Sequence, residues 1–110
     1  MKINEQKLDE VMLELGHRDS VKGTEYIRIG AALYEREMSM TKELYPAIAK
    51  AAKTTPSRVE RAMRHSITSA WSRGSMEAQR KYFGYSVHPV KGAPTVGEYI
   101  ARVVRVCGAD

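Results

Sequence analysis

The stretch from residue 45 to residue 73 restricts the fold more than any other part of the sequence. It contains two helical patterns, YPAIAKAA and PSRVERAMRHSITSAWSR, separated only by the short turn KTT. Small alanine side chains on the first helix allow two helices to cross closely, as a helix-turn-helix motif requires. Lys53 stands in the turn, where glycine is common. The pattern predicts a helix-turn-helix at about residues 45–73.

The second helix of this motif has the clearest boundaries in the chain. Thr55 is suited to cap its N-terminus, Pro56 fits the first helical position, and Gly74 can end it. Residues at helical spacing form one apolar stripe, which predicts the side that packs on the core. The stripe consists of Val59, Ala62, Met63, Ile67, Ala70 and Trp71.

The rest of the chain also has helical periodicity, and no stretch alternates long enough to predict a sheet. The chain has 110 residues, about the size of one ordinary domain. We therefore expect an all-α fold, a single compact domain of about six helices spanning residues 1–110. The other helices are predicted at residues 4–15, 24–37, 41–52, 75–83 and 95–106, with a loop over residues 85–94.

Local signals predict where three of these helices begin and where one packs closely. Asn4 and Thr41 are candidate N-caps, and Thr95 with Glu98 has the spacing of a capping box. Gly30 lies inside a predicted helix, where glycine costs about 1 kcal/mol relative to alanine. A close helix contact at Gly30 would explain its presence.

The positive charge of the chain is concentrated in one block. The whole sequence has a formal net charge of +5. Residues 41–82 contain nine basic and three acidic side chains, whereas the remainder contains nine basic and ten acidic ones. The basic block includes the predicted helix-turn-helix, which indicates a face that binds a polyanion.

The residues at the start of the second helix of such a motif meet base edges in the DNA major groove. Arg58, Glu60 and Arg61 occupy these positions. Arginine can donate two hydrogen bonds to guanine, and glutamate can accept one from the cytosine amino group. We therefore expect these three residues to contact bases. Phosphate contacts are expected from Lys50, Lys53, Ser57, Arg64 and His65.

Two other interpretations of this surface stay open. Glu60 and Arg64 have the i, i+4 spacing of an ordinary ion pair on a solvated helix. A helix-turn-helix fold can also be retained for protein binding, as a stand-alone interaction or antagonist module that competes with a full-length regulator. The intact set of arginines favours DNA binding.

The sequence contains no arrangement typical of an enzyme. A nucleophile elbow, a Cys/His pair and a pair of catalytic carboxylates are all missing. His17, His65 and His88 are widely separated and have no partners at metal-ligand spacing, so we expect surface or backbone-bonding roles. Cys107 is expected to be a thiol packed in the last helix. We expect no catalysis, no cofactor and no metal.

The sequence also lacks the signals of a membrane or exported protein. The first 20 residues alternate charged and apolar side chains, unlike the core of a signal peptide. No apolar run approaches the roughly 18 residues that a membrane-spanning helix needs. We expect no membrane association and a cytoplasmic, nucleoid-associated location.

Specific motifs within residues 41–74 resemble a known family. The runs LYP, IAK, SRVERA, RH and AWSRG are similar to the C-terminal effector domain of stage zero sporulation protein A, a response regulator of sporulation. The resemblance continues through FGY, PT and EYIA and covers about residues 8–105. It implies a six-helix fold that regulates transcription. No receiver domain fits before Lys7, so we expect the effector domain alone.

The resemblance also implies partners and contact residues. The family binds double-stranded DNA at boxes close to TGTCGAA, as homodimers on tandem sites. By this resemblance, Arg58, Glu60 and Arg61 correspond to base-contacting positions, and Arg64 and His65 lie near the DNA backbone. Residues 74–87 correspond to the family's surface for the polymerase sigma factor. The candidate residues on that surface are Gly74, Met76, Ala78, Arg80, Phe83 and Val87.

Overall fold

The computed structural model describes residues 2–18, 21–84 and 92–108. Within these ranges the chain forms six α-helices and one π-helical turn, and its only extended pairing is a single bridge between Ile3 and Gly108. This confirms the predicted all-α fold. The elements are α1 (Glu5–Glu14), α2 (Lys22–Leu33), η1 (Met40–Leu44), α3 (Tyr45–Ala52), α4 (Pro56–Arg73), α5 (Met76–Phe83) and α6 (Val96–Cys107).

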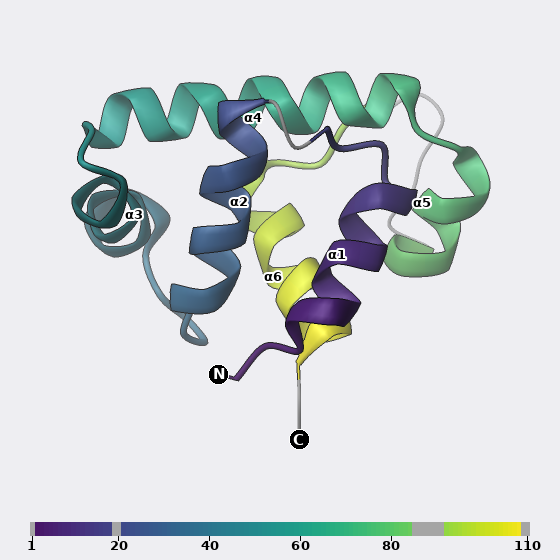
Figure 1. Ribbon diagram of the computed structural model, residues 1–110, viewed down its shortest axis with the longest axis horizontal. Coiled ribbons are helices and arrows are strands. Elements are labelled where there is room, and N and C mark those ends of the chain that lie inside the picture. Colours follow the sequence, from purple (N-terminus) through teal and green to yellow (C-terminus); the bar gives the residue numbers. More distant parts are fainter. Residues whose placement is uncertain (1, 19–20, 85–91, 109–110) are drawn as a thin grey trace.

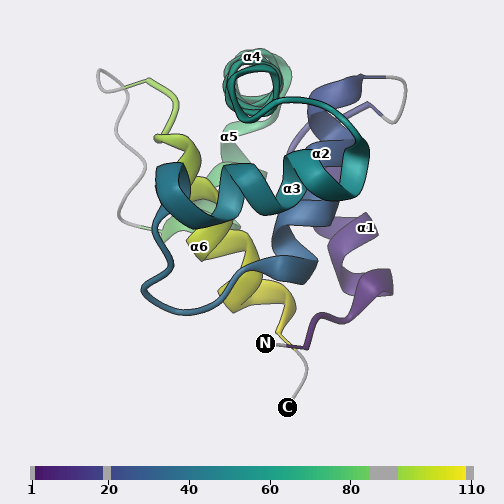
Figure 2. The same cartoon turned by 90° about the vertical axis from the view of Figure 1, so that its left-hand side faces the viewer.

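Helix α4 is the longest element and lies across one side of the molecule. Helices α1, α2 and α6 lie beneath it, with α3 at one end and α5 at the other (Figure 1). Seen from the α3 end, α3 runs across the molecule below α4, which is viewed along its axis (Figure 2). The two chain ends meet on the side away from α4, where the Asn4 amide donates to the Cys107 carbonyl at 2.9 Å.

The core lies where α2, α3, α4 and α6 meet. The apolar stripe predicted for α4 supplies its upper wall, with Val59, Met63 and Ile67 fully buried. Cys107 is also fully buried at the end of α6, which confirms the prediction of a packed thiol. The other large side chains with almost no exposed surface are Val11, Met12, Leu15, Ile27, Leu44, Ile48, Tyr99, Ile100 and Val103.

Two glycines of α2 allow the close packing of this core. An added Cβ at Gly30 would lie 2.9 Å from Cδ1 of Ile48, which confirms the close contact predicted there. The contact at Gly23 is closer still, because an added Cβ would lie 2.2 Å from the carbonyl oxygen of Ala62 on α4. Helix α2 therefore crosses α4 at backbone contact distance.

Several predicted helix ends are confirmed. The side chains of Asn4, Thr55 and Thr95 cap α1, α4 and α6, and Thr95 forms the predicted capping box with Glu98. Gly74 ends α4 as expected. The predicted loop over residues 85–94 lies mostly outside the described residues.

Two predicted boundaries are wrong. Ser39, not Thr41, caps the third helical segment, because this segment opens with a π-helical turn in which the Leu44 amide bonds to the Ser39 carbonyl. Pro46 follows in the first turn of α3, where its missing amide donor is tolerated. Helix α2 ends at Leu33, although the apolar pattern continues to Tyr34, whose side chain packs against the core from extended backbone.

Candidate nucleic-acid interface

Helices α3 and α4 form the predicted helix-turn-helix, and the turn between them depends on one residue. Lys53 adopts the left-handed conformation, with φ of 58° and ψ of 50°, that glycine usually supplies after a helix. Its amide and that of Thr54 both bond to the Ala49 carbonyl, which closes α3. Thr55 then begins α4 by accepting a hydrogen bond from the Arg58 amide at 3.3 Å.

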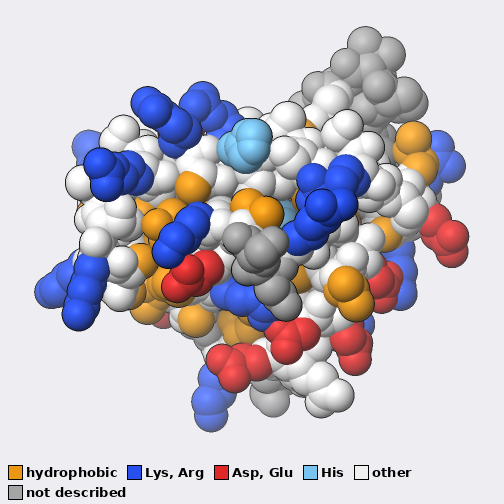
Figure 3. Space-filling model, turned by 45° about the horizontal axis from the view of Figure 1, so that its top comes forward, with side chains coloured by type: hydrophobic (Ala, Val, Ile, Leu, Met, Phe, Trp, Pro, Cys, Tyr) orange, Lys and Arg blue, Asp and Glu red, His pale blue; other side chains and the backbone are white. Residues whose placement is uncertain are grey.

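The N-terminal half of α4 presents a basic, exposed face. Arg58, Arg61 and His65 are exposed and follow one another at spacings of three and four residues, which places them on one side of the helix. Figure 3 shows this side of the molecule, where Lys and Arg side chains and a histidine are spread over the surface. Most acidic side chains in this view lie along the lower and right-hand edges.

The remaining predicted DNA-contacting residues surround this face. Lys50, Lys53, Ser57 and Arg64 are all exposed, on α3, on the turn and on α4. The helix-turn-helix therefore brings together every basic side chain that the sequence analysis assigned to DNA.

Glu60 differs from its neighbours because its side chain is only 36% exposed. Its Oε1 lies 3.5 Å from Nε of Arg64, so the ion pair considered as an alternative does form. Such exposed i, i+4 pairs contribute only about 0.5 kcal/mol. The contact is weak enough to open when either side chain is offered a better partner.

Tyr45, at the start of α3, faces the same two charges. It lines a surface hollow together with Glu60, Arg64 and the beginning of α6. Burial raises the pKa of the Tyr45 hydroxyl, the negative charge of Glu60 raises it further, and the positive charge of Arg64 opposes the shift. The phenol therefore stays neutral beside the ion pair.

The buried side of α4 is held by polar contacts that the sequence analysis missed. His17 is buried, with Nδ1 3.2 Å from the Ser66 hydroxyl and Nε2 2.6 Å from the Tyr99 hydroxyl. The expected surface or backbone-bonding role of His17 is therefore wrong. Burial, together with the positive charges of Arg73 and Arg28, lowers the pKa of His17 to about 4. His65 is exposed as expected, and His88 lies outside the described residues.

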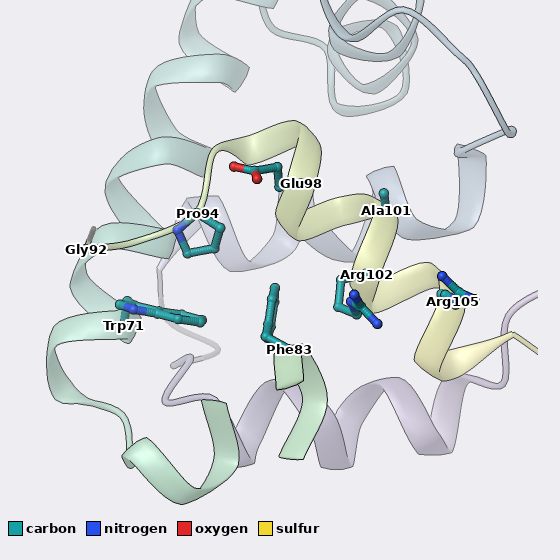
Figure 4. Close-up of a pocket in the computed structure, with 8 residues that line it drawn as sticks. All are labelled: Trp71, Phe83, Gly92, Pro94, Glu98, Ala101, Arg102 and Arg105. Carbon is teal, nitrogen blue, oxygen red and sulfur yellow. The ribbon is translucent and has the colours of Figure 1, made fainter. Parts of the chain in front are cut away.

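Trp71, near the end of α4, is partly buried and packs against the core. Its ring lies edge-on to Phe83 at 5.0 Å and to Tyr99 at 6.3 Å between centroids. The rest of its surface lines a pocket of about 260 Å³ between α4, α5 and α6, where Phe83 and Arg102 also point inward (Figure 4). The tryptophan therefore belongs to the hydrophobic packing and not to the exposed basic face.

The residues assigned to a sigma-factor surface differ in exposure. Met76 and Arg80 are exposed on α5, whereas Ala78 and Phe83 are buried and Gly74 is half-buried. Val87 lies outside the described residues. Of the residues in this set that the structure describes, only Met76 and Arg80 have side chains open to a partner.

Neither a three-residue metal cluster nor a membrane-spanning helix occurs in the described part of the chain. No three His, Cys, Asp or Glu side chains there come close enough to hold a metal ion. No helix among these residues is long and apolar enough to cross a membrane.

A helix-turn-helix whose second helix exposes a row of arginines defines a class of DNA-binding domains. The family described as sporulation initiation factor Spo0A C terminal matches residues 8–106, nearly the whole chain, and the chain belongs to this family. The family is the DNA-binding effector domain of a sporulation regulator, so the protein is a DNA-binding regulator of transcription.

Proposed function

We propose that the chain recognises specific sequences in double-stranded DNA by inserting the N-terminal half of α4 into the major groove. The observation that carries this proposal is the exposed row formed by Arg58, Arg61 and His65 on a helix whose opposite side is buried. Arg58 and Arg61 donate to guanine, and Glu60 accepts from a cytosine amino group after leaving Arg64.

The phosphate contacts in this proposal come from the edges of the same motif. Lys50 and Lys53 approach the backbone from α3 and the turn, and Ser57, Arg64 and His65 approach it from α4. These contacts set the position of the helix without selecting a sequence. The family suggests boxes close to TGTCGAA, bound by two copies in tandem.

Contact with the polymerase sigma factor is a second part of the proposal. Met76 and Arg80 are the residues of the assigned surface, within the described ranges, whose side chains are exposed. We therefore assign this contact to the outer side of α5. A reporter assay that compares Arg80→Ala with the unaltered chain at equal promoter occupancy tests the assignment.

The DNA proposal is tested by fluorescence anisotropy with a duplex carrying two tandem boxes and a scrambled duplex, at two salt concentrations. Specific DNA-binding proteins prefer their sites by about a thousandfold or more. A preference of that order supports the proposal. Equal, salt-sensitive binding to both duplexes would show that the chain binds DNA only through non-specific charge attraction. No binding to either duplex would favour a protein-interaction or antagonist role.

Arg61→Ala tests the role of a single base-contacting residue in the same assay. We expect this variant to lose about 1–3 kcal/mol of binding free energy on the boxes and to discriminate less at one base pair. The matched control is Arg105→Ala, which removes an exposed arginine from α6 and should leave the preference unchanged. An equal loss for Arg61→Ala on every duplex would show that Arg61 contacts phosphate instead.

A further inference from the structure

The residues just after α1 and those at the beginning of α2 lie directly against α4. An added Cβ at Gly16 would lie 3.0 Å from the Ala70 carbonyl oxygen, and one at Gly23 would lie 2.2 Å from that of Ala62. These two contacts are eight residues apart on α4, which corresponds to about 12 Å along the helix axis. Gly16 and Gly23 therefore contact α4 at two places along the same helix.

Hydrogen bonds from residues next to the two glycines also join this part of the chain to α4. His17 and Thr24 both contact the hydroxyl of Ser66, at 3.2 Å and 3.5 Å. Arg73, at the end of α4, donates to the Gly16 carbonyl at 2.8 Å. The residues beside these anchors are consequently held in a defined place relative to α4.

Two of those neighbouring residues are exposed cations. Arg18 follows the buried His17, and Lys22 precedes the buried Gly23. Neither forms an ion pair with any carboxylate in the described part of the chain. Both charges are thus available to an external anion.

The beginning of α2 lies beside the proposed base-contacting face of α4. Gly23 contacts α4 at Ala62, and Arg58 lies one helical turn before Ala62 on the same side. His65, three residues after Ala62, also borders this edge. The opposite edge of α4, with Glu60 and Arg64, faces Tyr45 and the start of α6.

The dimensions of DNA explain what such an edge would meet. The major groove is about 12 Å wide, and an α-helix with its side chains is about 10–12 Å across. A helix that enters the groove therefore fills it, and the elements on its two sides face the phosphate backbones that form the groove walls. The edge that carries Arg18 and Lys22 would face one of these walls.

We infer that Arg18 and Lys22 bind phosphates on the groove wall next to α2, as a second set of backbone contacts outside the helix-turn-helix. This inference rests on the proposed insertion of α4 into the major groove. It assigns to Arg18, after α1, and to Lys22, the first residue of α2, a direct part in DNA affinity without a part in base selection. Asp19 lies between the two cations in the sequence, outside the described residues.

The test measures DNA affinity against salt concentration for Arg18→Ala, Lys22→Ala and the double variant, on the box duplex and the scrambled duplex. Each phosphate contact contributes about one to the slope of log K against log salt. We expect each single variant to lower that slope by about one and the double variant by about two. The loss of affinity should be the same on both duplexes.

Arg36→Ala is the matched control. Arg36 is an exposed arginine just past the other end of α2, and the twelve residues of this helix span about 18 Å. The Arg36→Ala variant removes the same charge at a place distant from Lys22 and should leave the slope of log K against log salt unchanged. A slope that falls equally for Arg36→Ala would show a general charge effect and would overturn the inference.

The inference and the proposed function can fail separately. If Arg61→Ala loses box preference but the double variant keeps the unaltered slope, α4 contacts bases and this second edge does not contact phosphate. If the unaltered chain binds neither duplex, both fail. Thermal unfolding of each variant checks the fold, and because both side chains are exposed we expect unchanged melting temperatures.

Discussion

Lys53 illustrates, at the scale of one residue, a conflict between local backbone preference and surface charge. The left-handed conformation costs an ordinary L-residue roughly 1–2 kcal/mol, and glycine avoids that cost. The chain nevertheless has a lysine at this position, with its side chain exposed beside the start of α4. The proposed phosphate contact of its ammonium group would be a reason for lysine to occupy this position.

Lys53→Gly should therefore separate stability from binding. We expect the free energy of unfolding to rise by about 1 kcal/mol, because glycine removes the backbone strain. DNA affinity should fall on all sequences alike, with a salt slope lower by about one. Chemical denaturation and the anisotropy titration measure the two effects.

Lys53→Ala is the control for this prediction, because alanine removes the charge but keeps the strain. It should reproduce the loss of affinity without the gain in stability. Equal unfolding free energies for the glycine and alanine variants would contradict the claim that the turn is strained.

The crossing of α2 and α4 shows how single helices are positioned. The backbone of Gly23 touches α4 at Ala62 and Ser66, so the two helices cannot approach any closer. The same contact determines how the exposed face of α4 is oriented relative to the rest of the fold.

Gly23→Ala should push these two helices apart. The added methyl would lie 2.2 Å from a backbone carbonyl oxygen, which cannot move without shifting α4. Overpacking of this kind costs about 1–3 kcal/mol. Denaturant unfolding should show a loss of at least this size, accompanied by weaker DNA binding.

Gly97→Ala provides the contrasting case. Gly97 lies in the first turn of α6, and an added Cβ there would meet the flexible side chain of Met40, with Cγ at an ordinary 3.4 Å and Sδ at 4.0 Å. This variant should be neutral or should gain up to about 1 kcal/mol from the better helix propensity of alanine. A similar loss for both glycine variants would contradict the steric explanation.

At the same scale, the sequence predicts those helix boundaries that depend on neighbouring residues. The ends of α4 follow from Thr55, Pro56 and Gly74, because caps and helix stops act within a few residues. The predicted start of the third helical segment is wrong, because helical periodicity in the sequence gives no signal for the π-helical turn that begins at Met40. The sequence also predicts that Arg58 and Arg61 are exposed, because neither belongs to the apolar stripe of α4 that packs on the core.

The whole molecule is tied together by contacts that sequence spacing does not predict. His17 joins Ser66, 49 residues away, and Tyr99, 82 residues away, so the α1–α2 segment, α4 and α6 meet at one imidazole. Which distant polar groups become partners depends on tertiary packing. Sequence reasoning therefore found the exposed face of α4 but missed the polar network behind it.

This network should make stability depend on pH. The pKa of His17 is about 4 in the folded protein, against an ordinary value of 6.5, so the unfolded chain binds the proton more tightly. The contribution of neutral His17 to the free energy of unfolding is complete above about pH 6.5 and is lost as the pH falls toward 4. Over that range it amounts to about 3 kcal/mol.

Unfolding free energies measured between pH 4 and pH 7 test this dependence. The His17→Gln variant, which cannot titrate at this position, should be less stable at neutral pH and should have a flatter pH profile. Parallel profiles for the two proteins would show that His17 does not carry the effect.

The meeting of the chain ends has a practical consequence for such measurements. Ile3 and Gly108 pair on the side of the molecule away from α4. A fluorophore, an affinity tag or a surface tether attached at either end would therefore lie on the opposite side of the molecule from α4. Immobilised protein would present α4 outward, so surface-based binding kinetics can be recorded from either terminus without blocking the DNA.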